Sequence, residues 1–202
     1  MTKLDEIENR MICKALSKVG LKVNSVYDLV NSSDNYPEAI PFLVDMLPKL
    51  KSDRIKEGVA RALTIRNAGK DVAKALIKEF KNYKASTKKE EYTKWAIANA
   101  ILVVADNSFF EEIANLIRNK EYGSGMVGGM LVKAIAKMKN SQKKDFLLEL
   151  LMDDDLKGYA ILVLGKLKYK EALPHIKKHL NCEEDWIRKE AEKAVKKIEC
   201  SK

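Results

Sequence analysis

A nine-residue pattern of apolar and small residues recurs five times along the 202-residue chain, and it constrains the fold more than any other feature. Each copy begins with a mostly apolar position, usually followed by a basic residue, and ends in small or apolar pairs separated by one variable position. The copies lie at residues 55–63, 93–101, 127–135, 156–164 and 187–195. They follow one another at intervals of roughly 30 to 40 residues, which is typical of stacked helical repeats. The pattern therefore predicts five helices, each with one apolar face.

A second amphipathic segment precedes each copy, so the sequence predicts helical hairpins. These first segments lie at residues 37–50, 71–80, 109–117, 144–152 and 171–180. The chain holds only 9 Gly and 4 Pro and shows no sustained alternation of apolar and polar residues. An all-α fold without strands follows from this composition.

Residues that favour helix starts support some of these boundaries. Thr87 with Glu90, and Ser108 with Glu111, have the spacing of a capping box. The acidic run at residues 153–155 is placed to cap the helix that follows it. We expect helices to begin at all three places.

The first 33 residues show the repeat pattern less clearly. They contain one amphipathic segment followed by a shorter one, which predicts an N-terminal helical cap over the apolar end of a repeat stack. We therefore expect residues 1–33 to form the cap and residues 34–202 to form the repeats of a single structural domain.

The last hairpin and the first one resemble the HEAT-repeat family, and most closely the bacterial HEAT-like repeats of phycobilisome-lyase type. The residues that carry this resemblance are Ala172, Leu173, Pro174, Ile187, Arg188, Ala191, Ala194 and Val195, together with Ala39, Ile40, Pro41, Asp53, Ile55, Lys56, Ala60, Ala62 and Leu63. The resemblance implies a right-handed α-α superhelix of about five hairpins, an armadillo-type solenoid whose second helices line a concave side. It also implies binding rather than a particular reaction.

The net charge and the cysteine content indicate which partners and which cellular compartment to expect. With 38 basic and 29 acidic residues the formal net charge is +9, which favours anionic partners without establishing nucleic-acid binding. The three cysteines have no CxxC spacing, so we predict neither a disulfide framework nor a cysteine zinc site. The N-terminus does not have the pattern of a signal peptide, and the apolar run at residues 100–105 is too short to span a bilayer. A cytoplasmic protein without membrane contact is expected.

Four of the repeated patterns carry a basic residue at their second position: Lys56, Lys94, Lys157 and Arg188. Two interpretations stay open. These cations form a structural ladder with acidic turn residues of adjacent repeats, or they form a strip on the concave face that binds anions as Lys and Arg bind phosphates. The acidic residues available for a ladder are Asp53, Asp153 and Glu184.

The third copy departs from the pattern, because Gly128 and Gly129 replace the basic residue and its neighbour. Glycine inside a helix is unfavourable, so a close backbone approach or an opening is expected there. One hypothesis is a concave pocket at this place, bounded by Tyr92, Lys94, Trp95, Gly128, Gly129 and Tyr159. The alternative is that the two glycines only allow tight helix packing.

Motifs for catalysis and for nucleotide or metal binding are absent from the sequence. It contains no P-loop, no dinucleotide-binding fingerprint, no HExxH and no GxSxG. His175, His179 and Cys182 have the spacing of one side of a helix, which is a weak indication of a metal site. We expect no catalytic residue, no metal and no cofactor.

The sequence therefore predicts a protein-binding module or scaffold that uses its concave face. One alternative is a nucleic-acid-binding protein resembling the alkylpurine DNA glycosylases built on HEAT-like repeats, for which Trp95, Tyr159 and Trp186 would supply aromatic surface. Another is an immunity protein that neutralises a toxin. The sequence specifies no individual partner.

Overall fold

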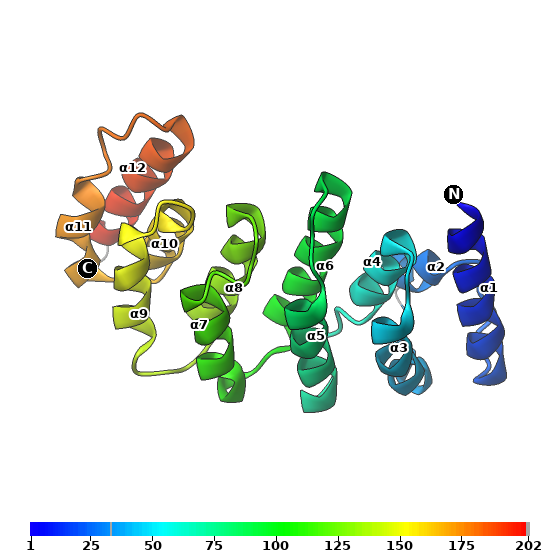
Figure 1. The fold of residues 1–202 in the computed structure, drawn as a ribbon. Helices are drawn as coiled ribbons and strands as arrows, with labels where there is room; N and C mark the ends of the chain where they lie inside the picture. The colour runs from blue at the N-terminus through cyan, green and yellow to red at the C-terminus, as the bar shows by residue number, and fades with distance from the viewer. Residues whose placement is uncertain (33, 201–202) are drawn as a thin grey trace. The chain divides into compact units, whose positions relative to one another are not determined.

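The computed structural model describes residues 1–32 and 34–200, and all regular structure in them is helical. The chain divides into two compact units, unit 1 (Met1–Ala105) and unit 2 (Asp106–Lys202). The helices of both units are labelled in Figure 1. In the described residues no helix combines the length and apolar character needed to cross a membrane.

Unit 1 contains two helical hairpins preceded by two further helices. Its elements are α1 (Lys3–Lys18), α2 (Val26–Asn31), η1 (Pro37–Ala39), α3 (Ile40–Met46), η2 (Leu47–Lys49), α4 (Asp53–Ala62), α5 (Lys70–Asn82) and α6 (Lys88–Val104). The second helices α4 and α6 pack against each other, and α2 packs on α4. Leu43, Leu76, Phe80 and Ile97 are fully buried between these layers.

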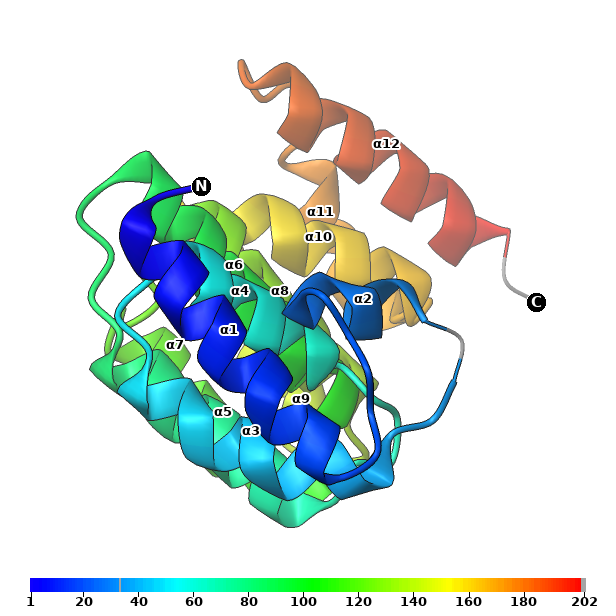
Figure 2. The ribbon, with the colours of Figure 1, turned by 90° about the vertical axis from the view of Figure 1, so that its right-hand side faces the viewer.

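Unit 2 contains three hairpins. Its elements are η3 (Asn107–Phe109), α7 (Phe110–Arg118), α8 (Gly125–Lys137), α9 (Lys143–Glu149), η4 (Leu150–Met152), α10 (Lys157–Lys166), η5 (Lys170–Ala172), α11 (Leu173–Lys177) and α12 (Asp185–Glu199). The helix α10 packs on both α8 and α12, and Figure 2 shows α12 beside α10. Ile113, Leu131, Ile161 and Ile176 are fully buried in this unit.

The five copies of the repeated pattern fall on α4, α6, α8, α10 and α12, as the sequence predicts. Each is paired with a shorter first helix, so the chain is an all-α repeat protein of the α-solenoid type with five hairpins. The pattern predicts these helices because, within each unit, the second helices pack on one another, α4 on α6 in unit 1 and α10 on α8 and α12 in unit 2.

Helices begin at all three expected places, but only α6 has the predicted side-chain cap, since the N-cap residue of α10, Leu156, makes no such bond. Thr87 and Glu90 form a reciprocal capping box, with backbone N–H···O distances of 3.3 and 2.9 Å. Asp153 Oδ1 accepts hydrogen bonds from the N–H groups of the two residues before α10, at 3.0 and 3.1 Å. The prediction for Ser108 is wrong, since this residue lies inside η3 and Asp106 caps that turn instead. Asp106, two residues earlier, accepts the free N–H group of Ser108 at 2.8 Å.

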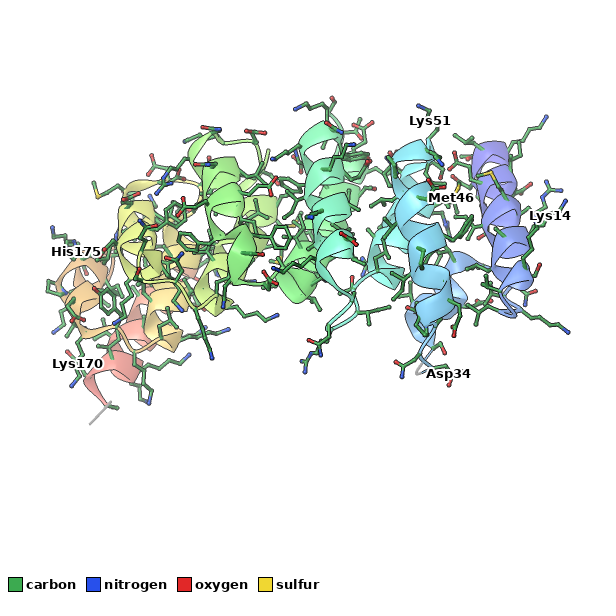
Figure 3. The ribbon with its side chains drawn as sticks, turned by 90° about the horizontal axis from the view of Figure 1, so that it is seen from below. Lys14, Asp34, Met46, Lys51, Lys170 and His175 are labelled. Carbon is green, nitrogen blue, oxygen red and sulfur yellow. The ribbon has the colours of Figure 1, made fainter. Side chains whose placement is uncertain are left out.

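The N-terminal helix α1 is fastened to the first hairpin through polar groups as well as apolar ones. Glu8 is buried, and its carboxylate accepts the backbone N–H groups of Lys51 and Ser52 at 2.8 and 3.0 Å, just before α4. The outward side carries Leu4, Ile7 and Met11, which are 42–50% exposed. Lys14 points away from the rest of unit 1 in Figure 3. The outer side of this helix is therefore partly apolar, unlike the polar outer face usual for a terminal repeat.

Candidate functional site

The surface side of the second helices carries three of the residues that the sequence singles out, Tyr92, Trp95 and Tyr159. We call it the second-helix face: in unit 1 it is formed by Arg54, Glu57, Arg61, Tyr92, Trp95 and Asn99 of α4 and α6. In unit 2 it is formed by Met126, Lys133, Tyr159, Leu162, Lys166, Trp186, Lys189 and Lys193 of α8, α10 and α12. The two parts are described separately below.

Lys56 and Lys94 lie inside unit 1 rather than on this face. Both residues are at most 6% exposed. The Lys56 ammonium pairs with the Glu79 carboxylate of α5 and lies 5.3 Å from the centre of the Tyr83 ring, while the Lys94 ammonium lies 4.8 Å from the centre of the Phe80 ring. This placement between first and second helices favours the structural interpretation for these two cations.

Asp53 links the first hairpin to the second through a cluster of polar groups. The Tyr83 hydroxyl donates to Asp53 Oδ1 at 2.7 Å, and the Thr93 hydroxyl donates to the Asp53 carbonyl at 3.3 Å. Lys89 Nζ lies 3.8 Å from Asp53 Oδ2. Burial and the bond to Asp53 raise the pKa of Tyr83, so this hydroxyl stays protonated as a donor. The acidic turn residue does bridge adjacent hairpins, although its cationic partner is Lys89 and not one of the four predicted cations.

Lys157 and Arg188 are engaged with acidic and carbonyl groups around the turns of unit 2. Lys157 Nζ lies 2.9 Å from Asp154 and 3.8 Å from Glu184 of the next hairpin, and the Asp154 hydrogen bond raises the pKa of Lys157. The Arg188 guanidinium donates to the Cys182 carbonyl at 2.8 Å and to a carboxylate of the first turn of α12. The contact of Lys157 with Glu184 has the form that the ladder interpretation predicts, whereas the contacts of Arg188 stay within its own hairpin.

The glycines of α8 are packed tightly against neighbouring side chains. A Cβ atom at Gly128 would lie 2.7 Å from Leu156 Cδ2 and 2.8 Å from the Tyr122 ring, and one at Gly129 would overlap the Tyr159 ring. Both distances are far below van der Waals contact, so an Ala at either place would force a ring or a helix to move. The close-packing alternative therefore accounts for both glycines, and the space beside them is filled by Tyr159 and Leu156 rather than open.

The unit 1 part of the face combines two aromatic residues with an ion pair. The Arg61 guanidinium lies 5.7 Å from the centre of the Trp95 ring, and its Nε donates to Glu57 Oε1 at 2.7 Å. Tyr92, one turn before Trp95 on α6, is 50% exposed. Tyr92, Lys94 and Trp95 thus all lie on α6, but only the two aromatic residues reach the surface.

The unit 2 part of the face holds an aromatic pair flanked by lysines. The rings of Tyr159 and Trp186 lie 5.0 Å apart at an angle of 58°. Lys133 Nζ lies 5.4 Å from the centre of the Tyr159 ring. Trp186 remains 43% exposed, although a Cβ at Gly158 would overlap its ring. Sequence reasoning missed Lys133, which could have been found as the residue one turn after Gly129 on the same side of α8.

An open hollow of about 730 Å³ lies in unit 1 at the C-terminal end of α4. Its walls include Tyr36, Arg61 and Ile65. The Tyr36 hydroxyl donates to the Ala62 carbonyl at 2.9 Å, and Arg61 is held by Glu57. These polar groups of the hollow are therefore engaged by the protein itself.

The three possible metal ligands of the last hairpin do not lie on one helix. The helix α11 ends at Lys177, so His179 and Cys182 fall in the turn after it. The helical spacing assumed for His175, His179 and Cys182 is therefore wrong, because the segment stops being helical before the second histidine. In the described part of the chain no three His, Cys, Asp or Glu residues are grouped for metal binding.

No protein-family model and no curated protein sequence matches the chain. Three solved structures with similar folds are engineered or designed proteins. An engineered protein covers 98% of this chain and 97% of its own, at 14% identity and a TM-score of 0.48. A designed armadillo repeat protein covers 86% of this chain and 98% of its own, at 16% identity and a TM-score of 0.38. A second engineered protein covers 94% of this chain and 57% of its own, at 16% identity and a TM-score of 0.48.

Proposed function

We propose that the chain is a non-enzymatic binding module, similar to HEAT-like repeats, that uses its second-helix face to hold a protein partner in the cytoplasm. The observation that carries the proposal is the exposed tryptophan of unit 2. Trp186 is 43% exposed although it sits on a regular helix, with its ring fixed against Gly158 and Tyr159. Rigid, partly exposed aromatic side chains commonly dominate the binding energy of protein interfaces.

The ion pairs of the second-helix face support a binding role over a catalytic one. Glu57 is held by Arg61 at 2.7 Å and accepts a hydrogen bond from the Tyr27 hydroxyl at 3.4 Å. Glu190 is held by Lys193 at 2.7 Å. A glycosylase-like mechanism needs a carboxylate placed to act on a bound base. Glu57 and Glu190 are instead occupied by neighbouring cations.

Nucleic-acid binding is the alternative function, because the chain is basic and its face is partly aromatic. It makes a different prediction, since release of counterions from a phosphate backbone gives affinity that falls steeply with salt. The toxin-neutralising alternative has less support, because the net charge of +9 does not complement a basic nuclease.

Affinity capture from the native cell extract tests the proposal. The bait is the full chain, compared with the double variant Tyr92→Ala/Trp186→Ala, which removes the exposed ring of each unit. The control Met152→Ala/Leu167→Ala removes two exposed apolar side chains that lie outside the second-helix face. We expect a protein partner that the wild type and the control retain and the aromatic variant loses. Equal recovery by all three baits would exclude the face as the binding surface.

A further inference from the structure

Two lysines of unit 2 carry charges that no carboxylate of the described residues balances through an ion pair. Lys133 of α8 is half-buried, and its Nζ lies 5.4 Å from the centre of the Tyr159 ring. Burial lowers the pKa of Lys133, and the charge of Lys166 acts in the same direction. Cations on one surface that have no carboxylate partner attract an anion.

Several other cations around this place contact carboxylates. Lys157 is paired with Asp154 and Glu184, and Lys189 with Asp185 at 2.6 Å. Arg188 also contacts Asp185 and Lys193 contacts Glu190, at 2.6 and 2.7 Å. Among the lysines assigned above to the second-helix face of unit 2, Lys133 and Lys166 have no ion pair with a carboxylate of the described residues, whereas Lys189 and Lys193 do.

An apolar surface formed by Tyr159, Leu162 and Trp186 lies beside Lys133. We call it the aromatic ledge. Tyr159, Leu162 and Lys166 are spaced i, i+3 and i+7 along α10, so they share one side of that helix. The Tyr159 ring packs against the ring of Trp186 on α12, and the two ring centres lie 5.0 Å apart. Gly129 and Gly158 let both rings lie close to the helix backbones, which fixes their positions. A ligand here meets the Lys133 cation next to the aromatic surface of Tyr159 and Trp186.

We propose that this part of the second-helix face binds an acidic segment of a protein partner. An aspartate or glutamate of the segment lies between Lys133 and Lys166, and an adjacent leucine or aromatic side chain packs on Tyr159 and Trp186. The inference rests on the proposed function and specifies the chemistry of the partner.

A protein segment fits this surface better than a nucleic acid does. A nucleic-acid strand presents a phosphate at every nucleotide and is bound along a continuous cationic groove. Here the cations that would continue such a groove, Lys157, Arg188, Lys189 and Lys193, are held by the protein's own carboxylates. A protein segment with one or two carboxylates beside an apolar side chain matches Lys133 and Lys166 together with the aromatic ledge.

Selection of a random 12-residue peptide library on the immobilised full chain tests the inference. We expect enriched peptides that place Asp or Glu next to Leu, Phe or Trp. One such peptide, labelled with a fluorophore, then gives dissociation constants by anisotropy for the wild type and for Lys133→Met/Lys166→Met. Methionine keeps the apolar stem of each lysine and removes its charge. We expect this variant to bind at least about 10-fold more weakly, because two charge contacts are lost.

The control variant Lys170→Ala/Lys178→Ala removes the same net charge from exposed positions around α11, and we expect it to bind as the wild type does. Peptides that need Trp186 but show no acidic preference would overturn the inference and leave the proposed function intact. Failure to enrich any peptide that needs Trp186 would count against both. A 12-nucleotide oligothymidine that displaces the peptide, with steep salt dependence, would overturn the inference in favour of nucleic acid.

Discussion

The buried pair of Lys56 and Glu79 gives the sharpest test of how unit 1 is held together. The two side chains are 8% and 5% exposed, so removing one leaves the other charged in a site that water hardly reaches. Loss of one partner of a buried pair costs about 3–5 kcal/mol, and the Tyr83 ring 5.3 Å from the ammonium offsets about 1 kcal/mol of this. We therefore expect Glu79→Ala to lower the free energy of unfolding of unit 1 by about 3 kcal/mol.

Urea unfolding followed by tryptophan fluorescence measures this effect. In a Trp186→Phe background the remaining tryptophan, Trp95, reports on unit 1 alone. A loss of about 3 kcal/mol corresponds to a midpoint lower by about 1–3 M urea for a unit of this size. The double variant Lys56→Met/Glu79→Leu replaces the pair with apolar side chains and is expected to unfold within about 1 kcal/mol of the wild type.

An exposed ion pair serves as the matched control. Lys49 and Asp45 lie 2.7 Å apart, with side chains 58% and 62% exposed, so Asp45→Ala is expected to cost less than about 1 kcal/mol. The reasoning is refuted if Glu79→Ala costs no more than Asp45→Ala. It is also refuted if the apolar double variant is as unstable as Glu79→Ala, because packing and not the unpaired charge would then explain the loss.

Two further predictions concern helix packing and pH. A Cβ on Gly165 would lie 2.5 Å from Ala194 Cβ and 2.7 Å from its Cα, so Gly165→Ala must push α12 away from α10. We expect the free energy of unfolding of unit 2 to fall by about 1–2 kcal/mol, although alanine in place of glycine would otherwise stabilise a helix by about 1 kcal/mol. Urea unfolding followed by Trp186 fluorescence measures this change. A stabilised variant would contradict the prediction. Hydrogen bonds from Ser52 and from the backbone lower the pKa of Asp5 from 3.8 to about 2. Because the folded state then binds the proton more weakly, the stability that Asp5 supplies is complete above about pH 4 and is lost as the pH falls towards 2. Urea midpoints of unit 1 between pH 2 and 5 should therefore fall less in Asp5→Asn than in the wild type, and parallel curves would refute the assignment.

Much of the fold could be predicted from the sequence because the signals for it are local. Apolar positions three and four residues apart define a helix face whatever surrounds it, so α4, α6, α8, α10 and α12 were all predictable. Capping residues act over one turn, and Thr87 with Glu90 was therefore identified correctly. The end of α11 before His179 was not identified, because the apolar residues Ile176 and Leu180 continue a helical spacing through a turn that is not helical.

The candidate site depended on contacts that the repeat pattern does not encode. Lys56 and Lys157 occupy the same position of the pattern, yet Lys56 is buried against Glu79 and Lys157 reaches the turn residues Asp154 and Glu184. The difference arises from the neighbouring helix, which supplies a buried carboxylate in one case and none in the other. Lys133 shows the same dependence, since its half-buried position and its contact with Tyr159 come from the adjacent hairpin.

The sequence by itself determined that the chain is a series of helical hairpins with small and apolar residues at the contacts between second helices. Only the tertiary structure decided that the ring of Tyr159 packs on Gly129 and the ring of Trp186 on Gly158. The two glycines, which are unfavourable for helix formation, thereby leave room for the aromatic pair. The physical reason is that helix formation depends on residues within one or two turns. The burial of a charge or a ring depends instead on the side chain that an adjacent repeat, about 30 residues away, places against it.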